Sequence, residues 1–179
     1  MRSCALGNES GLIMAGYPAE RPEKPFPYFI EVMDGFEYTA AVEMLFDKQI
    51  DLGLKTILAI RDRYDGKKRN PLNEPEWGNH YVRSMMAWAG VIAISEFSYS
   101  AVDEAMSFTS NDGSYFWSNG YQYGTIEIKT SEGKKLVGIT FLNGFIKLRS
   151  FRLNGFGELF FKKAKLFEAN KTEILEIKR

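Results

Sequence analysis

The sequence predicts a mainly α protein with an appended antiparallel β part. Apolar residues recur at helical spacing between about 34 and 99, whereas short apolar–polar alternation begins at about Ala105. The chain has 179 residues, of which 45% are hydrophobic and 26% charged, as expected for one globular domain or one domain with a small appendage. We therefore expect three parts: a proline-rich loop segment at 1–33, a helical piece at 34–99 and a β-rich part at 100–179.

The first part, residues 1–33, is rich in residues that favour turns. Four prolines fall within ten residues, at Pro18, Pro22, Pro25 and Pro27. Proline cannot continue a helix or a central strand, so this segment is expected to be irregular. Long irregular segments in front of a compact domain usually line a site or dock on other structure.

The second part is expected to begin with two helices. Asp34 is the expected N-cap of the first helix, whose apolar residues share one face. Asp51 is the expected N-cap of the second helix, which Gly66 ends. The short connection around 48–51 predicts that the two helices form an antiparallel hairpin.

A polar loop and a third helix follow. Proline disfavours helical geometry in the residue before it, so Asn70 and Glu74 are expected in extended conformations. Asn79 is the expected cap of a helix that runs to about Phe97 and is apolar almost all round. That pattern predicts a helix buried on several sides.

The third part is expected to be antiparallel β structure. Alternation predicts strands at 125–129, 135–141 and 145–153, with weaker candidates at 158–161 and 173–178. Asn143-Gly144 stands between two of these strands, and both residues favour positive φ. The dipeptide therefore predicts a hairpin.

Composition excludes several classes of function. Lys plus Arg and Asp plus Glu are both 23, so the formal net charge is zero and no nucleic-acid partner is expected. Cys4 and His80 are the only residues of their kinds, which excludes an intrachain disulfide and a cysteine metal cage. No spacing implies a metal or a cofactor. The longest nearly apolar run, 85–94, is too short for a membrane span.

The beginning of the chain carries no evident signal peptide, because the first ten residues contain no apolar core. This favours a cytoplasmic location if Met1 is the native start of the protein.

The stretch with the most chemistry is RDRYDGKKRNPLNEPEWGNHYVR, at 61–83. It combines carboxylates and bases, which hydrogen-bond sugar hydroxyls, with aromatic faces, which stack on sugar rings. Glu74 and Arg83 could together hold neighbouring hydroxyls in a fixed fork. A solvated surface loop is the alternative, and the pattern alone favours it. Glu74 and Glu76 are two residues apart, which points them to opposite faces and argues against a facing catalytic pair.

Three motifs in order resemble glycoside hydrolase family 116, which includes β-glucosidases and the non-lysosomal glucosylceramidase. RPEKPFPYFIEVMDGFEYTAA is similar to a proline-rich loop and Gly-Phe-Glu-Tyr helix start of that family. RDRYDGKKRNPLNEPEWGNHYVRSMMAWA is similar to its signature near the C-terminal end, and FWSNGYQYGTIEI to the segment that leads into β structure. The resemblance covers about residues 16–124.

The resemblance implies the last helices of an (α/α)6 barrel, a six-hairpin glycosidase fold, followed by β strands. It implies that Glu74 and Arg83 hold hydroxyls of the glucose unit of a β-glucoside or other carbohydrate substrate, and that Glu31 is a further sugar contact. No residue here matches the family's nucleophile or its general acid/base, so no catalytic residue is assigned. Two departures, Met33 in place of a tryptophan and Pro75 after Glu74, put the substrate preference in doubt.

Two hypotheses follow. In the first, the chain is the C-terminal fragment of a retaining β-glucosidase-like hydrolase, supplies sugar-binding residues, is inactive alone and needs the missing N-terminal part of the same hydrolase. A barrel of that kind needs about twelve helices and this sequence offers three. In the second, it is a non-catalytic carbohydrate-binding or interaction remnant that folds alone.

Overall fold

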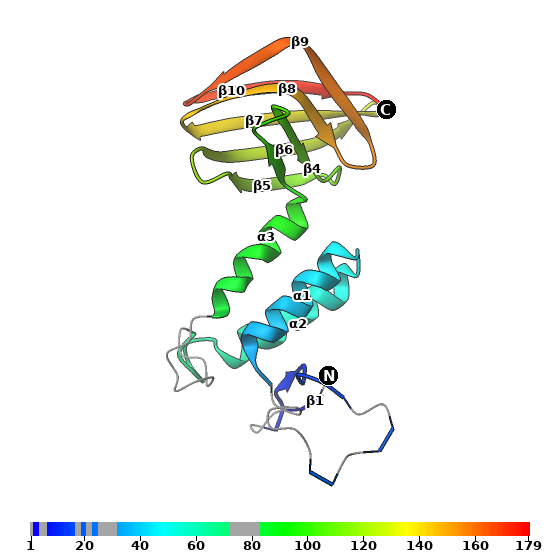
Figure 1. The fold of residues 1–179 in the computed structure, drawn as a ribbon, viewed down its shortest axis with the longest axis vertical. Helices are drawn as coiled ribbons and strands as arrows, with labels where there is room; N and C mark the ends of the chain where they lie inside the picture. The colour runs from blue at the N-terminus through cyan, green and yellow to red at the C-terminus, as the bar shows by residue number, and fades with distance from the viewer. Residues whose placement is uncertain (1, 4–6, 17–18, 21–22, 25–31, 72–82) are drawn as a thin grey trace. The chain divides into compact units, whose positions relative to one another are not determined.

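The computed structural model describes residues 2–3, 7–16, 19–20, 23–24, 32–71 and 83–179. The chain divides into two compact units, residues 1–90 and 91–179 (Figure 1). In the described residues, the first unit is helical apart from a short β pair, and the second unit is built mainly of strands.

The first unit is organised around a helical hairpin. It contains α1 (Asp34–Phe46) and α2 (Ile50–Arg63), which lie side by side (Figure 1). The predicted hairpin is confirmed. The helices approach closely at Gly53, because a Cβ atom there would lie 2.8 Å from Leu45 Cγ. A two-residue pair of strands, β1 (Arg2–Ser3) and β2 (Ser10–Gly11), precedes the hairpin.

Both predicted helix caps are wrong by a small shift. Met33 stands at the N-cap of α1 and Gln49 at the N-cap of α2, and neither makes a side-chain cap hydrogen bond. Asp34 and Asp51 instead lie in the first turns of their helices, where a negative charge still interacts favourably with the helix dipole.

The third helix differs from its prediction. A 3-10 turn, η1 (Arg83–Met86), leads into α3 (Ala87–Ser95), and the predicted cap Asn79 lies outside the described residues. Trp88 is 71% exposed, and Val91 and Ile92 are also exposed. The expected burial on several sides is therefore wrong for this chain. No helix in the described parts of the chain has the length and hydropathy needed to cross a bilayer.

The second unit is a β-sandwich. One sheet has the order β3-β4-β8-β9 and the other β10-β7-β6-β5, and every pairing is antiparallel except that of β4 with β8. The first sheet consists of β3 (Ser98–Ser100), β4 (Ala105–Phe108), β8 (Phe145–Leu153) and β9 (Gly157–Glu168). The second consists of β5 (Gly113–Ser118), β6 (Tyr123–Ser131), β7 (Lys134–Asn143) and β10 (Lys171–Ile177).

Alternation along the strands produces one core between the two sheets. Buried and exposed residues alternate along β6, and the same pattern occurs in most of β7 and β8. Its largest fully buried side chains include Trp117, Phe108, Phe141, Phe151 and Phe167. Trp117 and Phe141 meet edge to face with ring centroids 5.3 Å apart, an arrangement that favours specific packing of the core.

The predicted fold class is wrong. The described residues form three α-helices but ten strands, with two four-stranded sheets, and helices of an (α/α)6 barrel are not observed. The strand at 157–168 accounts for part of the difference. It alternates weakly and carries charged residues on exposed positions, so the sequence pattern predicted only 158–161 of it.

The predicted Asn143-Gly144 hairpin is also wrong. Gly144 has φ +74°, as the dipeptide suggested, but β7 and β8 belong to different sheets. The turn therefore moves the chain from one layer to the other. The true hairpin of this region joins β6 to β7 through Glu132 and Gly133, whose φ angles are +50° and +77°.

Candidate functional site

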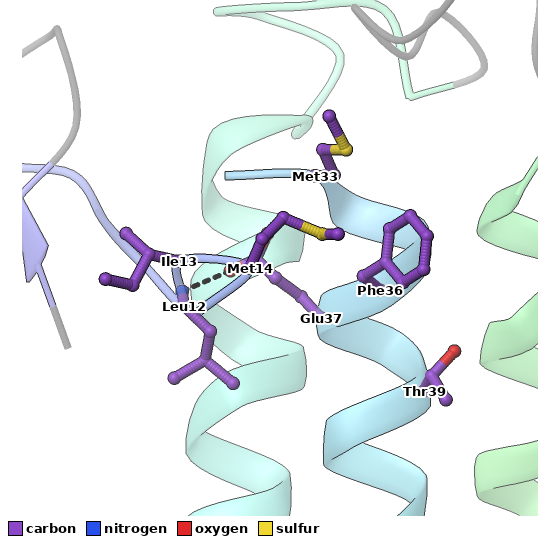
Figure 2. Close-up of a pocket in the computed structure, with 7 residues that line it drawn as sticks. All are labelled: Leu12, Ile13, Met14, Met33, Phe36, Glu37 and Thr39. Carbon is purple, nitrogen blue, oxygen red and sulfur yellow. Dashed lines mark hydrogen bonds between the residues drawn. The ribbon is translucent and has the colours of Figure 1, made fainter. Parts of the chain in front are cut away.

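A pocket of about 150 Å³ lies at the N-terminal end of α1. Residues 12–14 form one side, and the first turns of α1, with Met33 just before them, form the other (Figure 2). Its lining side chains, drawn in Figure 2, are mostly apolar: Leu12, Ile13, Met14, Met33, Phe36, Glu37 and Thr39. Pockets with apolar walls and a few fixed polar groups suit small organic ligands.

Glu37 is the charged residue of this lining, and it is paired inside the protein. Its Oε2 accepts a hydrogen bond from Arg63 Nη2 on α2, and the two side chains are only 2% and 5% exposed. Its Oε1 accepts a hydrogen bond of 2.7 Å from the backbone N–H of Leu12, shown as the dashed line in Figure 2. Both carboxylate oxygens are thus engaged.

The guanidinium of Arg63 ties three segments together. Besides Glu37, it donates to the carbonyl of Ser10 at 2.5 Å and to that of Ala59 at 3.4 Å. The β2 segment, α1 and α2 therefore meet at one buried cation. A buried charge of this kind is tolerated because it is paired with Glu37 and also bonded to two backbone carbonyls.

A second acid–base pair reinforces the same junction. Arg69 forms two hydrogen bonds to Glu9, of 2.6 and 3.1 Å, and donates to the carbonyl of Arg63 at 3.1 Å. The Glu9 side chain is 2% exposed, and the parallel bonds to Arg69 lower its pKa despite the opposing effect of burial. The segment 9–12 is held against the helical hairpin at both ends.

Gly11 explains why this approach is so close. A Cβ atom at residue 11 would lie 2.6 Å from Val32 Cγ1 and 2.9 Å from both Arg63 Nη1 and Glu37 Oε1. A residue with a Cβ atom at position 11 would therefore displace Val32 or the Glu37–Arg63 pair.

Burial raises the pKa of Glu37 above its ordinary value of 4.5, and the attraction of Arg63 only partly offsets this. A carboxyl group with a raised pKa in a pocket is a candidate general acid. Here, however, both oxygens accept internal hydrogen bonds, so the arrangement fits a group that braces the pocket wall and positions its neighbours.

The sequence-predicted sugar contacts border this region of the chain. Glu31 and Glu74 lie outside the described residues, and of Arg83 the backbone alone is described, as the first residue of η1. Met33, the residue that replaces a tryptophan of the resembled family, does line the pocket. The three predicted contacts themselves stay predictions.

Sequence reasoning missed the buried pairs of Glu37 with Arg63 and Glu9 with Arg69. Arg63 and Arg69 belong to the charged stretch 61–83, which the pattern alone favoured as a solvated loop. Asp65 fits that interpretation, because it accepts hydrogen bonds from the backbone N–H groups of residues 67 and 68 in an exposed turn. The one sequence signal that pointed to Glu37 was the Gly-Phe-Glu-Tyr motif, which places this residue at a helix start.

The chain was also compared with known proteins. No protein-family model and no curated protein sequence matches it, so the resemblance to family 116 stays a hypothesis that rests on the quoted motifs.

Proposed function

We propose that residues 1–90 are the sugar-holding part of a retaining β-glucosidase-like hydrolase, in which Glu31, Glu74 and Arg83 bind hydroxyl groups of the glucose unit. The observation that carries the proposal is the pocket at the start of α1. Met33 and Phe36, which come shortly after Glu31 in the chain, line it, and the Glu37–Arg63 pair braces its wall. The proposal includes no helical barrel.

In this mechanism the groups named here position the sugar and do not break its bond. A retaining hydrolase uses one carboxylate that attacks the anomeric carbon and a second that protonates the leaving oxygen. Glu74 and Arg83 would hold hydroxyls by charge-assisted hydrogen bonds, which fix the ring at the reacting carboxylates. The reacting carboxylates would come from the missing N-terminal part of the same hydrolase.

The exposed apolar side chains of η1 and α3 support a partner of this kind. Met85 is 66% exposed and Trp88 is 71% exposed, and large adjoining apolar side chains of this kind usually mark a contact surface. We propose that the missing part of the hydrolase covers them.

The first test is the mass of the native polypeptide in its source cells, measured with an antibody raised against this chain. A polypeptide several times heavier than 20.4 kDa supports the proposal, and a polypeptide of 20.4 kDa contradicts it unless a separate hydrolase subunit copurifies.

The second test is kinetic and uses the complete hydrolase. Glu74→Gln or Arg83→Ala is expected to lower kcat/KM for an aryl β-glucoside on the order of a hundredfold, because a buried polar partner is left unpaired. Arg61→Ala, which changes an exposed arginine of α2, is the matched control and should leave kcat/KM unchanged. Near-wild-type kinetics in both site variants would refute the assignment.

A second candidate is a non-catalytic carbohydrate-binding module. The observation that favours it is the self-contained core of residues 91–179, which needs no contribution from another domain. A cooperative, monomeric melt of the isolated chain would favour this candidate, whereas aggregation or binding of an apolar dye would favour the fragment.

A further inference from the structure

The β-sandwich carries a polar hollow of about 200 Å³ on the outer face of its β3-β4-β8-β9 sheet. We call it the serine groove. Short side chains create the hollow, and charged side chains border it: Ser98, Ser100, Asp103, Ala105, Met106, Ser107, Ser150, Arg152 and Glu158. The volume is several times the roughly 30 Å³ of one water molecule in the liquid, so there is room for a ligand the size of one sugar ring.

Strand register explains why these residues meet. One row across the sheet runs from Ser98 through Ser107 and Arg152 to Glu158. The neighbouring row runs from Ser100 through Ala105 and Ser150 to Phe160. Residues that face each other across strands point to the same side of a sheet, so both rows lie on the outer face.

The pairing of β8 with β9 is irregular beside the second row. The register between β8 and β9 shifts between Leu148 and Ser150, and the carbonyl of Glu104 accepts the backbone N–H groups of both Arg149 and Ser150. Ser150 lines the groove and is only 7% exposed.

The serine groove has hydrogen-bonding capacity that the protein does not use. In the described part of the chain, the hydroxyls of Ser98, Ser107 and Ser150 have no hydrogen-bond partner. Each hydroxyl can donate one hydrogen bond and accept others. A ligand rich in hydroxyl groups could both donate hydrogen bonds to these serine hydroxyls and accept hydrogen bonds from them.

The charged residues of the groove favour a neutral ligand. Arg152 Nε lies 3.3 Å from Glu158 Oε2, which leaves its other guanidinium N–H groups for a ligand. Asp103 Oδ2 accepts a hydrogen bond of 2.7 Å from Ser100, and its carboxylate has a second oxygen. The groove holds two carboxylates, of Asp103 and Glu158, and one guanidinium, of Arg152, so its net charge would repel an anion. Sugar hydroxyls can donate hydrogen bonds to the carboxylates and accept them from the guanidinium.

An exposed aromatic ring neighbours one residue of the groove. Phe160 stands directly opposite Ser150 in the register of β8 and β9 and is 72% exposed. An apolar ring beside hydrogen-bonding groups matches a sugar, which has C–H faces and hydroxyl edges.

We propose that the serine groove binds one sugar unit of a neutral saccharide, with Phe160 packed on a ring face and the serine hydroxyls, Asp103 and Arg152 bonded to the hydroxyls. The inference goes beyond the hydrolase proposal and gives the second candidate, a carbohydrate-binding module, a definite site, because every residue of the groove belongs to the second unit. It holds whether or not residues 1–90 contact sugar. The small, open hollow predicts weak binding of a single unit.

The test is an NMR titration of the full ¹⁵N-labelled chain with cellotriose, laminaritriose and maltotriose at millimolar concentration. At least one trisaccharide is expected to shift amide signals of β3, β4 and β8 around residues 98–107 and 150–153. Phe160→Ala should raise the Kd about fivefold to tenfold, as expected for the loss of one aromatic contact. Ser107→Val, which keeps a residue suited to a strand, should raise it as well.

Phe145→Ala is the matched control, because Phe145 is likewise an exposed ring of this sheet, 63% exposed, but lies on β8 five residues from Ser150. It should leave the Kd unchanged. The inference is overturned if no trisaccharide shifts these amides, or if Phe160→Ala binds as tightly as the wild type. Binding that Glu74→Gln abolishes and Phe160→Ala preserves would also overturn it, while supporting the proposed site of the first unit.

Discussion

Replacing Arg63 by methionine tests whether the buried ion pair holds the first unit together. The side chains of Arg63 and Glu37 are 5% and 2% exposed, so the substitution leaves a buried carboxylate without its counter-charge. It also removes the 2.5 Å hydrogen bond to the carbonyl of Ser10. Removing one partner of a buried pair typically costs about 3–5 kcal/mol, and we expect a loss of about 4 kcal/mol in the free energy of unfolding of this unit.

The assay is urea unfolding of the full chain, with one signal for each unit. The helical circular-dichroism band follows α1 and α2, and the NMR signal of the Trp117 indole N–H follows the β-sandwich core. Two units need not unfold in one step, so the two signals are fitted separately. At a urea m-value of about 2 kcal/mol/M, a loss of about 4 kcal/mol lowers the helical midpoint by about 2 M. The Trp117 midpoint should not move.

Two further variants make the test decisive. Arg61→Met changes an exposed arginine of the same helix and should alter stability by less than about 0.5 kcal/mol. Combining Glu37→Leu with Arg63→Met removes both charges and should recover a large part of the loss, because no charge is then left buried. If Arg63→Met unfolds like Arg61→Met, the pair does not stabilise the fold and the reasoning is wrong.

The remaining predictions concern the second unit. Gly124→Ala places a Cβ atom 2.0 Å from the carbonyl oxygen of Thr140, so the backbone must shift; we expect a loss of about 2–3 kcal/mol, measured by the Trp117 signal in urea. The hydrogen bonds from Lys135 and Thr130 lower the pKa of Asp112 from 3.8 to about 2. Because the folded-state pKa of Asp112 is depressed, its contribution to the free energy of unfolding is complete above pH 3.8 and is lost as the pH falls towards 2. A carboxyl ¹³C titration measures the pKa of Asp112, and Lys135→Met should raise that pKa.

The sequence predicted local structure better than it predicted the fold. Alternation correctly located strands in 125–129, 135–141 and 145–153, since period-two burial follows from strand geometry. The Asn143-Gly144 turn shows the limit of such signals. Its residues determine the backbone angles of the turn, but they do not determine whether the next strand pairs in the same sheet or crosses to the other.

The candidate site shows the same limit at longer range. Glu37 and Arg63 are 26 residues apart, and Arg69 and Glu9 are 60 apart. Opposite charges are frequent in any sequence, and only the packing of β2 on the hairpin selects these partners. The serine groove could not be predicted either, because it depends on the parallel pairing of β4 with β8.

The parallel pairing of β4 with β8 has a consequence for the kinetics of folding. α1 and α2 are joined through residues 47–49 and can dock by local contacts within their own segment. β4 pairs with β8 across the intervening strands β5, β6 and β7, which belong to the other sheet, so we expect Ala105 to meet Ser150 late in folding. Contacts between residues distant in sequence slow folding, because loop-closure entropy must be overcome first. The helical hairpin should therefore form quickly, and the sandwich should complete its central register afterwards, on a slower timescale.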